Sequence, residues 1–217
     1  MTPLTALIPA QTLTREETAA QSLAGGTAGI ALLHVERARA GTGDWATAHT
    51  YLRQATSAPV NASTAGTGLY YGAPALAFVL HAAADGHPAY RSATAALDPH
   101  VLRLVRRRLA TAAARRRRRE PATFSEYDVF SGLTGLGALL LACLPGSGEL
   151  GDVLHYLVRR TEPHLDEGMW VPGWWVAHNP DPTMPTPGGH ANTGMAHGAA
   201  VILGPGNDLW HVRRVGR

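Results

Sequence analysis

Apolar residues along the chain gather in four segments, and a turn of small residues introduces each one. The first glycines of these turns lie 46, 60 and 66 residues apart. Such a repeat predicts an array of one supersecondary unit, in which each unit buries its apolar face against its neighbours. The turns and the runs that follow them are Gly26–Gly29 with 30–40, Gly72–Ala75 with 76–84, Gly132–Gly135 with 136–144, and Gly198–Val201 with 202–203.

The segments between these runs are more polar and follow a helical period. In the last of them, apolar side chains recur at i, i+3, i+4, i+7 and i+8, which is the spacing of one helix face. The run 136–144 is apolar on every side, as in a helix packed inside an assembly. The sequence therefore predicts an all-α chain of helical hairpins, an α/α solenoid or toroid, with no competing strand pattern. Its outer helices are Asp44–Ala55, Pro99–Ala114 and Glu149–Thr161.

The glycines that open the inner helices have a predicted role in packing. A glycine lets the backbone turn sharply and lets a neighbouring segment come close. The fourth repeat departs from this pattern, because Val201 stands where a small residue is expected and Gly204 to Gly206 cut the helix short. We therefore expect an N-terminal segment over 1–20, a partial toroid domain over 21–205 and an unrelated tail over 206–217.

Charge and cysteine content narrow the function classes. All 19 basic residues are arginines, and nine of them fall between Arg103 and Arg119; without these nine, ten basic residues face 16 acidic ones. The basic character is therefore local. The run Arg115–Arg119 lacks interleaved aromatics, so it favours a solvated helix end over a nucleic-acid site.

Two further features bear on the compartment. The single cysteine, Cys143, excludes an intramolecular disulfide framework and is most simply a buried small residue. The N-terminus has no basic region, its apolar stretch is broken by Pro3 and Pro9, and no segment approaches the ~20 apolar residues that span a bilayer. We expect a cytoplasmic protein.

The segment from Pro172 to Gly198 is the richest in candidate chemistry. This long Pro/Gly loop carries Trp174 and Trp175 and delivers His197 to the mouth of an inner helix, beside a glycine where a substrate backbone has room. An imidazole titrates near neutral pH and can exchange a proton with a thiol or an enolate. The alternative for His197 is a histidine bonded to nearby backbone. The two tryptophans are candidates for walling a peptide pocket or for packing the loop.

Other residues of this kind lie elsewhere in the chain. Asp128 precedes the third inner helix as His197 precedes the fourth, so in a ring the two would face one cavity; alternatively, Asp128 caps the helix or turn. Tyr71 stands at the equivalent place before the second inner helix, as core or cavity wall. His178 and His190 read as loop residues with ordinary contacts. The sequence shows no metal-ligand constellation, since a thiol-activating zinc site needs cysteines and histidines together.

Three segments resemble the lanthionine synthetase C-like cyclases of lanthipeptide biosynthesis: Gly25–Leu33, Tyr127–Gly137 and Gly188–Ala200. The resemblance covers about 20–200, and the Asn-x-Gly-Met-Ala-His-Gly segment after the Trp/Pro loop is its most specific part. It implies a toroid of seven helical hairpins, of which about four are present here. It also implies an enzyme that adds cysteine thiols to dehydroalanine or dehydrobutyrine in a dehydrated precursor peptide, forming thioether rings.

The resemblance also assigns roles. Asp128 matches the family's acidic residue and His197 its active-site histidine. Trp174, Trp175 and Tyr71 are candidate substrate contacts from their positions in the chain alone. The family's zinc ligands lie in later hairpins, so we expect no metal in this chain and a protein that is truncated, by a reading-frame change or gene truncation near Val201, and inactive alone.

The expected partners are the precursor peptide and a lanthipeptide dehydratase, with no nucleic acid and no membrane span. A second hypothesis is a non-catalytic half-toroid that binds the peptide or the dehydratase. A carbohydrate-active toroid is disfavoured, since no carboxylate pair occupies comparable inner-helix positions.

Overall fold

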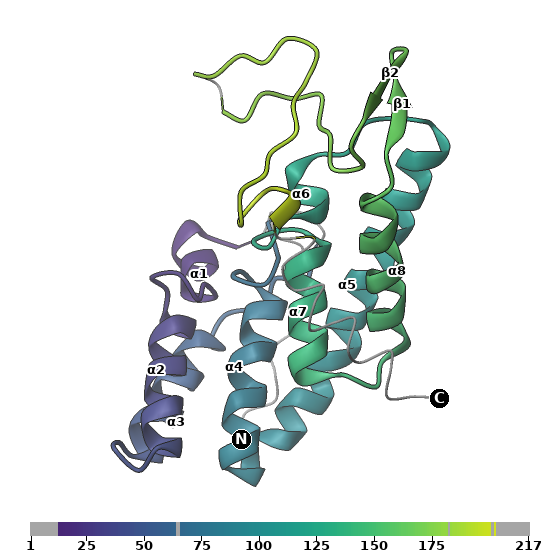
Figure 1. Cartoon of the computed structure of the whole chain (residues 1–217). Helices are drawn as coiled ribbons and strands as arrows, with labels where there is room; N and C mark the ends of the chain where they lie inside the picture. Colours follow the sequence, from purple (N-terminus) through teal and green to yellow (C-terminus); the bar gives the residue numbers. More distant parts are fainter. Residues whose placement is uncertain (1–12, 64–65, 182, 201, 203–217) are drawn as a thin grey trace. The chain divides into compact units, whose positions relative to one another are not determined.

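The computed structural model describes residues 13–63, 66–181, 183–200 and 202. Two compact units divide the chain, residues 1–105 and 106–217. Within the described residues the chain is mostly helical, which confirms the all-α prediction (Figure 1). Closure of the hairpins into a ring stays a prediction. The departure at Val201 and the tail over 206–217 lie outside the described residues.

The first unit is built around α2 (Thr27–Arg39), which contacts both α3 (Trp45–Ala55) and α4 (Ala73–Gly86). As predicted, α4 is an inner helix: its buried residues include Leu76, Val79 and Leu80. The predicted inner helix α2 buries small residues but leaves Ile30 and Leu33 exposed. The remaining elements of this unit are α1 (Arg15–Ala20), the short 3-10 helix η2 (Pro88–Tyr90) and the start of α5 (Arg91–Arg117).

The second unit contains the rest of α5, α6 (Phe124–Tyr127), α7 (Leu133–Cys143) and α8 (Gly148–Arg160). The apolar face of α8 packs on α7, where Gly137 lets the two helices approach: a Cβ on this glycine would lie 2.9 Å from Val153 Cγ1. Leu133, Leu136, Leu139 and Leu140 of α7 are all buried, as expected of an inner helix.

Each repeat glycine stands where another backbone segment comes close, which confirms their predicted packing role. A Cβ would lie 2.1 Å from Ala19 O at Gly26, 2.6 Å from Asn61 O at Gly72, 2.2 Å from Asp128 N at Gly132 and 2.3 Å from Asn192 O at Gly198. Only Gly72 of the three helix N-caps also has a positive φ, of 70°. Steric exclusion, more than backbone conformation, therefore requires glycine at these turns.

Two local predictions were wrong. Helix α5 begins at Arg91 rather than at Pro99. Ala93 and Leu97 before the proline and Val101 after it are all buried, so one face of the helix packs continuously across Pro99. The proline signal at its N-terminus was overridden by packing. A short antiparallel hairpin, β1 (His164–Asp166) with β2 (Met169–Val171), was also missed; Glu167 and Gly168 both have positive φ in its two-residue turn. Among the described residues, no helix is long and apolar enough to cross a membrane.

Candidate functional site

Asp128 lies where α6 ends and the chain turns into α7. Its Oδ1 atom accepts hydrogen bonds from the backbone N–H groups of Ser131 (2.7 Å) and Gly132 (2.8 Å). These N–H groups precede the first turn of α7, where backbone donors lack helical partners. The residue is 3% exposed. The predicted capping role of Asp128 is therefore present, and it uses only one of the two carboxylate oxygens.

The other oxygen of Asp128 holds His197. His197 Nδ1 lies 2.8 Å from Asp128 Oδ2, and both residues belong to the second unit. An ionised carboxylate has no proton to give, so Nδ1–H donates to it. A neutral His197 ring then carries its free electron pair on Nε2, which is the basic atom. His197 is thus bonded to a buried carboxylate rather than to nearby backbone.

Two phenylalanines hold the His197 ring in place. Phe124 stacks on it at 5.6 Å between centroids and 28° between planes, and Phe130 contacts it at 5.4 Å. The backbone N–H of Val129 donates to Ala196 O, which ties the histidine segment to the Asp128 segment. The His197 side chain is still 44% exposed. The imidazole is therefore oriented by its neighbours and open to a substrate.

The backbone around His197 is folded on itself. Ala199 N–H donates to Asn192 O, and Gly194 N–H donates to Asn192 Oδ1. Gly198 is buried against Asn192 O, so the close approach at this glycine is made by the chain itself. The predicted room for a substrate backbone beside His197 is therefore filled on this side of Gly198, and contact with a substrate stays a prediction.

His178 and His190 are connected to the site through Phe124. Both rings pack edge-on against Phe124, at 4.6 and 5.4 Å. His178 Nε2 also lies 3.2 Å from the Phe124 N–H, which donates to it. The two histidines are loop residues, as predicted, but their contacts support the ring that orients His197. Phe124 was not predicted as a site residue. The available signal was its position three residues before Tyr127, since both side chains are aromatic.

The loop tryptophans pack against the second unit. Trp174 lies against the cluster of Ala122, Tyr127 and Val176, and its carbonyl accepts a hydrogen bond from the Tyr127 hydroxyl at 3.0 Å. Trp175 Nε1 is buried beside Gly189. At least one of the two therefore packs the loop, as predicted. Their contact with a peptide, and that of Tyr71 in the first unit, stay predictions.

The family described as "Lanthionine synthetase C-like protein" matches residues 17–204. The chain belongs to the lanthionine synthetase C-like family. No curated protein matches the chain significantly. The family match includes both Asp128 and His197.

Members of this family are expected to use zinc, so we asked whether the residues present fit that metal. In the described ranges, no three His, Cys, Asp or Glu side chains lie together as metal ligands do. Cys143 is half-buried on the apolar helix α7, and in the sequence it adjoins neither Asp128 nor His197. The described residues do not fit a zinc site.

A buried polar network lies next to the site in this family member. Arg115 binds Glu126 with two hydrogen bonds, Nε to Oε2 at 2.5 Å and Nη2 to Oε1 at 2.8 Å, and the Tyr156 hydroxyl donates to Oε1 at 2.7 Å. Arg115 is therefore a half-buried ion-pair residue, which corrects the prediction for this one arginine, whereas Arg116–Arg119 are exposed as predicted for a solvated helix end. Burial raises the pKa of Tyr127, the residue before Asp128, to about 12.

Arg160 is a second, less well paired cation in the same network. It is 9% exposed, its Nε and Nη2 atoms are buried without hydrogen-bond partners in the described residues, and its guanidinium lies 5.3 Å from the Tyr127 ring centre. Burial lowers the pKa of Arg160.

Replacing these two arginines should have unequal costs. Arg115→Met leaves the half-buried Glu126 without its ion pair and should lower the free energy of unfolding by about 2 kcal/mol, whereas Arg160→Met should lower it by less than about 1 kcal/mol. Urea titration followed by circular dichroism measures both. Equal losses of unfolding free energy in the two variants would contradict the ion pair between Glu126 and Arg115.

Proposed function

We propose that this protein acts in lanthipeptide biosynthesis, and that Asp128 and His197 move the protons when a cysteine thiol adds to dehydroalanine or dehydrobutyrine. The observation that carries the proposal is the 2.8 Å contact between His197 Nδ1 and a carboxylate whose other oxygen is fixed by two backbone N–H groups. Such an arrangement sets both the orientation and the tautomer of an imidazole. Membership in the family supports the choice of reaction.

The chemistry needs one base and one acid. His197 Nε2 takes the thiol proton, and the sulfur attacks the β carbon of the dehydrated residue to form the C–S bond. The π electrons of the alkene move toward the adjacent carbonyl and give an enolate. The imidazolium returns its proton to the α carbon, so no atom is lost and nothing is oxidised or reduced. The buried Asp128 carboxylate stabilises the imidazolium between the two transfers.

The supply of thiolate should limit this reaction. The thiolate is the nucleophile, and an ordinary cysteine with a pKa of about 8.5 is only about 3% ionised at pH 7. A zinc ion would ionise the thiol outright. We therefore expect the chain alone to be nearly inactive, so that cyclisation at pH 7 is at most about tenfold faster than the spontaneous reaction. Because the reaction consumes free thiols, we place it in a reducing compartment, the cytoplasm.

The second candidate is a module that binds the precursor peptide or a partner dehydratase without catalysis. The exposed side chains of the hairpin favour an interaction role, since Leu165 and Trp170 are paired across the strands and are 60% and 76% exposed. Exposed apolar groups of this size gathered together are typical of contact surfaces.

One experiment separates the two candidates. The purified chain is incubated with dehydrated precursor, with and without Zn²⁺, and free thiols are counted by alkylation and mass spectrometry. The proposal predicts a small acceleration over the spontaneous rate that is lost in His197→Ala and retained in His155→Ala, an exposed histidine of α8. Binding with identical rates in all three proteins would support the binding module instead.

A further inference from the structure

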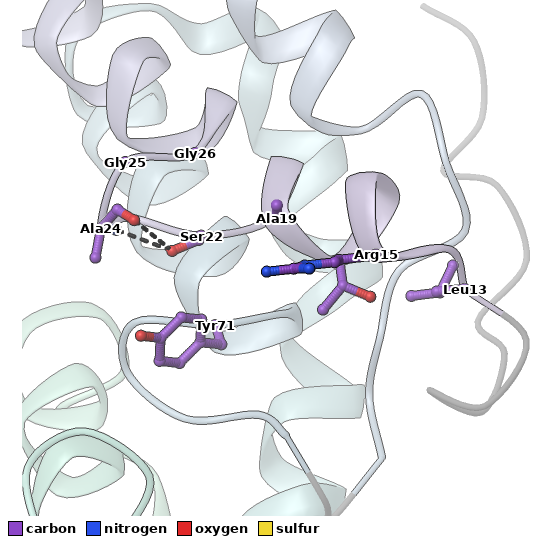
Figure 2. Close-up of a pocket in the computed structure, with 9 residues that line it drawn as sticks. Leu13, Arg15, Ala19, Ser22, Ala24, Gly25, Gly26 and Tyr71 are labelled. Atoms are coloured by element: carbon purple, nitrogen blue, oxygen red, sulfur yellow. Dashed lines mark hydrogen bonds between the residues drawn. The ribbon is translucent and has the colours of Figure 1, made fainter.

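A cavity of about 400 Å³, open to the surface, lies in the first unit between α1, the start of α2 and the segment before α4, and Arg15 and Tyr71 in its lining are exposed (Figure 2). This volume is in the range of small-ligand sites. Figure 2 shows the Arg15 guanidinium pointing toward the side of the cavity where Ser22 and Tyr71 lie. Apart from Arg15, the residues that line the cavity are uncharged. They are Leu13, Thr18, Ala19, Ser22, Ala24, Gly25, Gly26 and Tyr71.

The sequence of α1 and the turn after it explains why a single charge faces the cavity. Arg15 and Ala19 lie four residues apart in α1, so they share one side of this helix, and Ser22 follows in the turn after it. The acidic residues of α1, Glu16 and Glu17, are not among the residues that line the cavity. Glu17 is held by the capping box, where its carboxylate accepts the backbone N–H of Thr14 at 2.8 Å. Among the described residues that line the cavity, Arg15 is therefore a cation without a carboxylate beside it.

The Thr18 and Ser22 hydroxyl groups at the cavity are engaged within the chain. The Thr18 hydroxyl donates to Thr14 O, and Ser22 Oγ donates to Ala24 O and accepts from the Ala24 N–H. Among the described residues, Arg15 forms no ion pair. A ligand would thus meet one unpaired guanidinium and mostly apolar walls.

The far wall of the cavity is held by backbone pairing. Leu23 N–H donates to Tyr70 O and Gly72 N–H donates to Gln21 O, both at 3.0 Å, so Tyr71 is fixed opposite Ser22. The buried Gln21 side chain bonds Pro59 O and the Asn61 N–H, which anchors the same segment. Preformed walls reduce the ordering cost of binding.

We propose that this cavity binds an aspartate or glutamate side chain of a peptide, with the carboxylate on Arg15 and the adjoining apolar part on Tyr71. A guanidinium matches a carboxylate with two parallel hydrogen bonds, and one cation balances one carboxylate better than it balances a doubly charged phosphate. The inference rests on the proposed function only in taking a peptide as the ligand, since it involves neither Asp128 nor His197.

Fluorescence anisotropy with the whole chain tests this site. The probes are a fluorescein-labelled Ala-Leu-Glu-Ala-Leu peptide and the same peptide with Gln in place of Glu. The wild type should bind the Glu peptide about three- to fivefold more tightly than the Gln peptide, the size of one exposed ion pair. Arg15→Gln should abolish that difference, Arg15→Lys should restore part of it, and Tyr71→Ala should weaken both peptides while Tyr71→Phe does not.

Controls keep the test independent of catalysis and of folding. Arg53→Gln removes an exposed arginine of α3 and should change nothing, and His197→Ala should bind both peptides as the wild type does. Circular dichroism of Arg15→Gln should match the wild type. Equal affinity for the two peptides, absence of binding, or an equal loss in Arg15→Gln and Arg53→Gln would overturn the proposal. Displacement of the probe by phosphate at lower concentration than by acetate would assign the cavity to phosphate instead.

Discussion

Asp128→Asn should reverse the tautomer of His197 and remove its contribution to the reaction. The asparagine carbonyl can still accept from the Ser131 and Gly132 N–H groups, which places its amide NH₂ toward His197. An NH₂ group is a donor, so Nδ1 must become the acceptor and the ring proton must move to Nε2. The basic nitrogen is then turned toward residue 128, and the anion that stabilises the imidazolium is lost.

Long-range ¹H–¹⁵N spectra of the imidazole report this change directly. The wild type should show a neutral His197 protonated at Nδ1, and Asp128→Asn should show the proton at Nε2, with a cyclisation rate equal to that of His197→Ala. Asp152→Asn, an exposed carboxylate of α8, is the charge-matched control and should alter neither. An unchanged tautomer in Asp128→Asn would mean that the carboxylate does not orient the ring.

Gly132→Ala should lower the free energy of unfolding by about 3 kcal/mol or more, because the new methyl group has no space. An ideal Cβ on this residue would lie 2.2 Å from Asp128 N, 2.4 Å from Tyr127 C and 2.7 Å from Asp128 O. All three are backbone atoms, so no side-chain rotation relieves the contact. The turn that anchors the Asp128 carboxylate must open, and the contact with His197 opens with it.

Urea unfolding compares this variant with a glycine of the same unit that is free of such contacts. Gly151 lies inside α8, and its Cβ would meet nothing within 4 Å. Gly151→Ala should therefore raise the free energy of unfolding by about 0.5–1 kcal/mol through the better helix propensity of alanine. A loss at Gly132 no larger than about 1 kcal/mol would show that the Asp128 turn is less tightly packed than described.

The helical elements were predictable because their apolar residues follow the helix period over long segments. Two kinds of feature were not. Helix α5 extends through Pro99 because Ala93, Leu97 and Val101 gain more from burial than the proline costs, and that balance depends on tertiary contacts. The hairpin strands have three residues each, too few for an alternating pattern to appear.

Prediction of the candidate site was partial for a similar reason. Sequence position alone presented capping and partnership with His197 as alternatives for Asp128. The structure has both, because a carboxylate has two oxygens and each meets a different partner. Phe124 was missed because its partner, His197, lies 73 residues further along the chain. The role of Arg115 was misassigned because its partner, Glu126, lies 11 residues further along. No periodicity encodes such pairs.

The configuration of the α carbon in the lanthionine product tests the proposed proton transfer most directly, since that carbon receives the last proton. The measurement is chiral gas chromatography of hydrolysed product formed from one precursor peptide by the wild type, by His197→Ala and without protein. If His197 delivers the proton, the wild type gives an excess of one epimer, and His197→Ala gives the same epimer ratio as the spontaneous reaction. A ratio that is identical in all three samples would contradict the assignment of His197 as the proton donor.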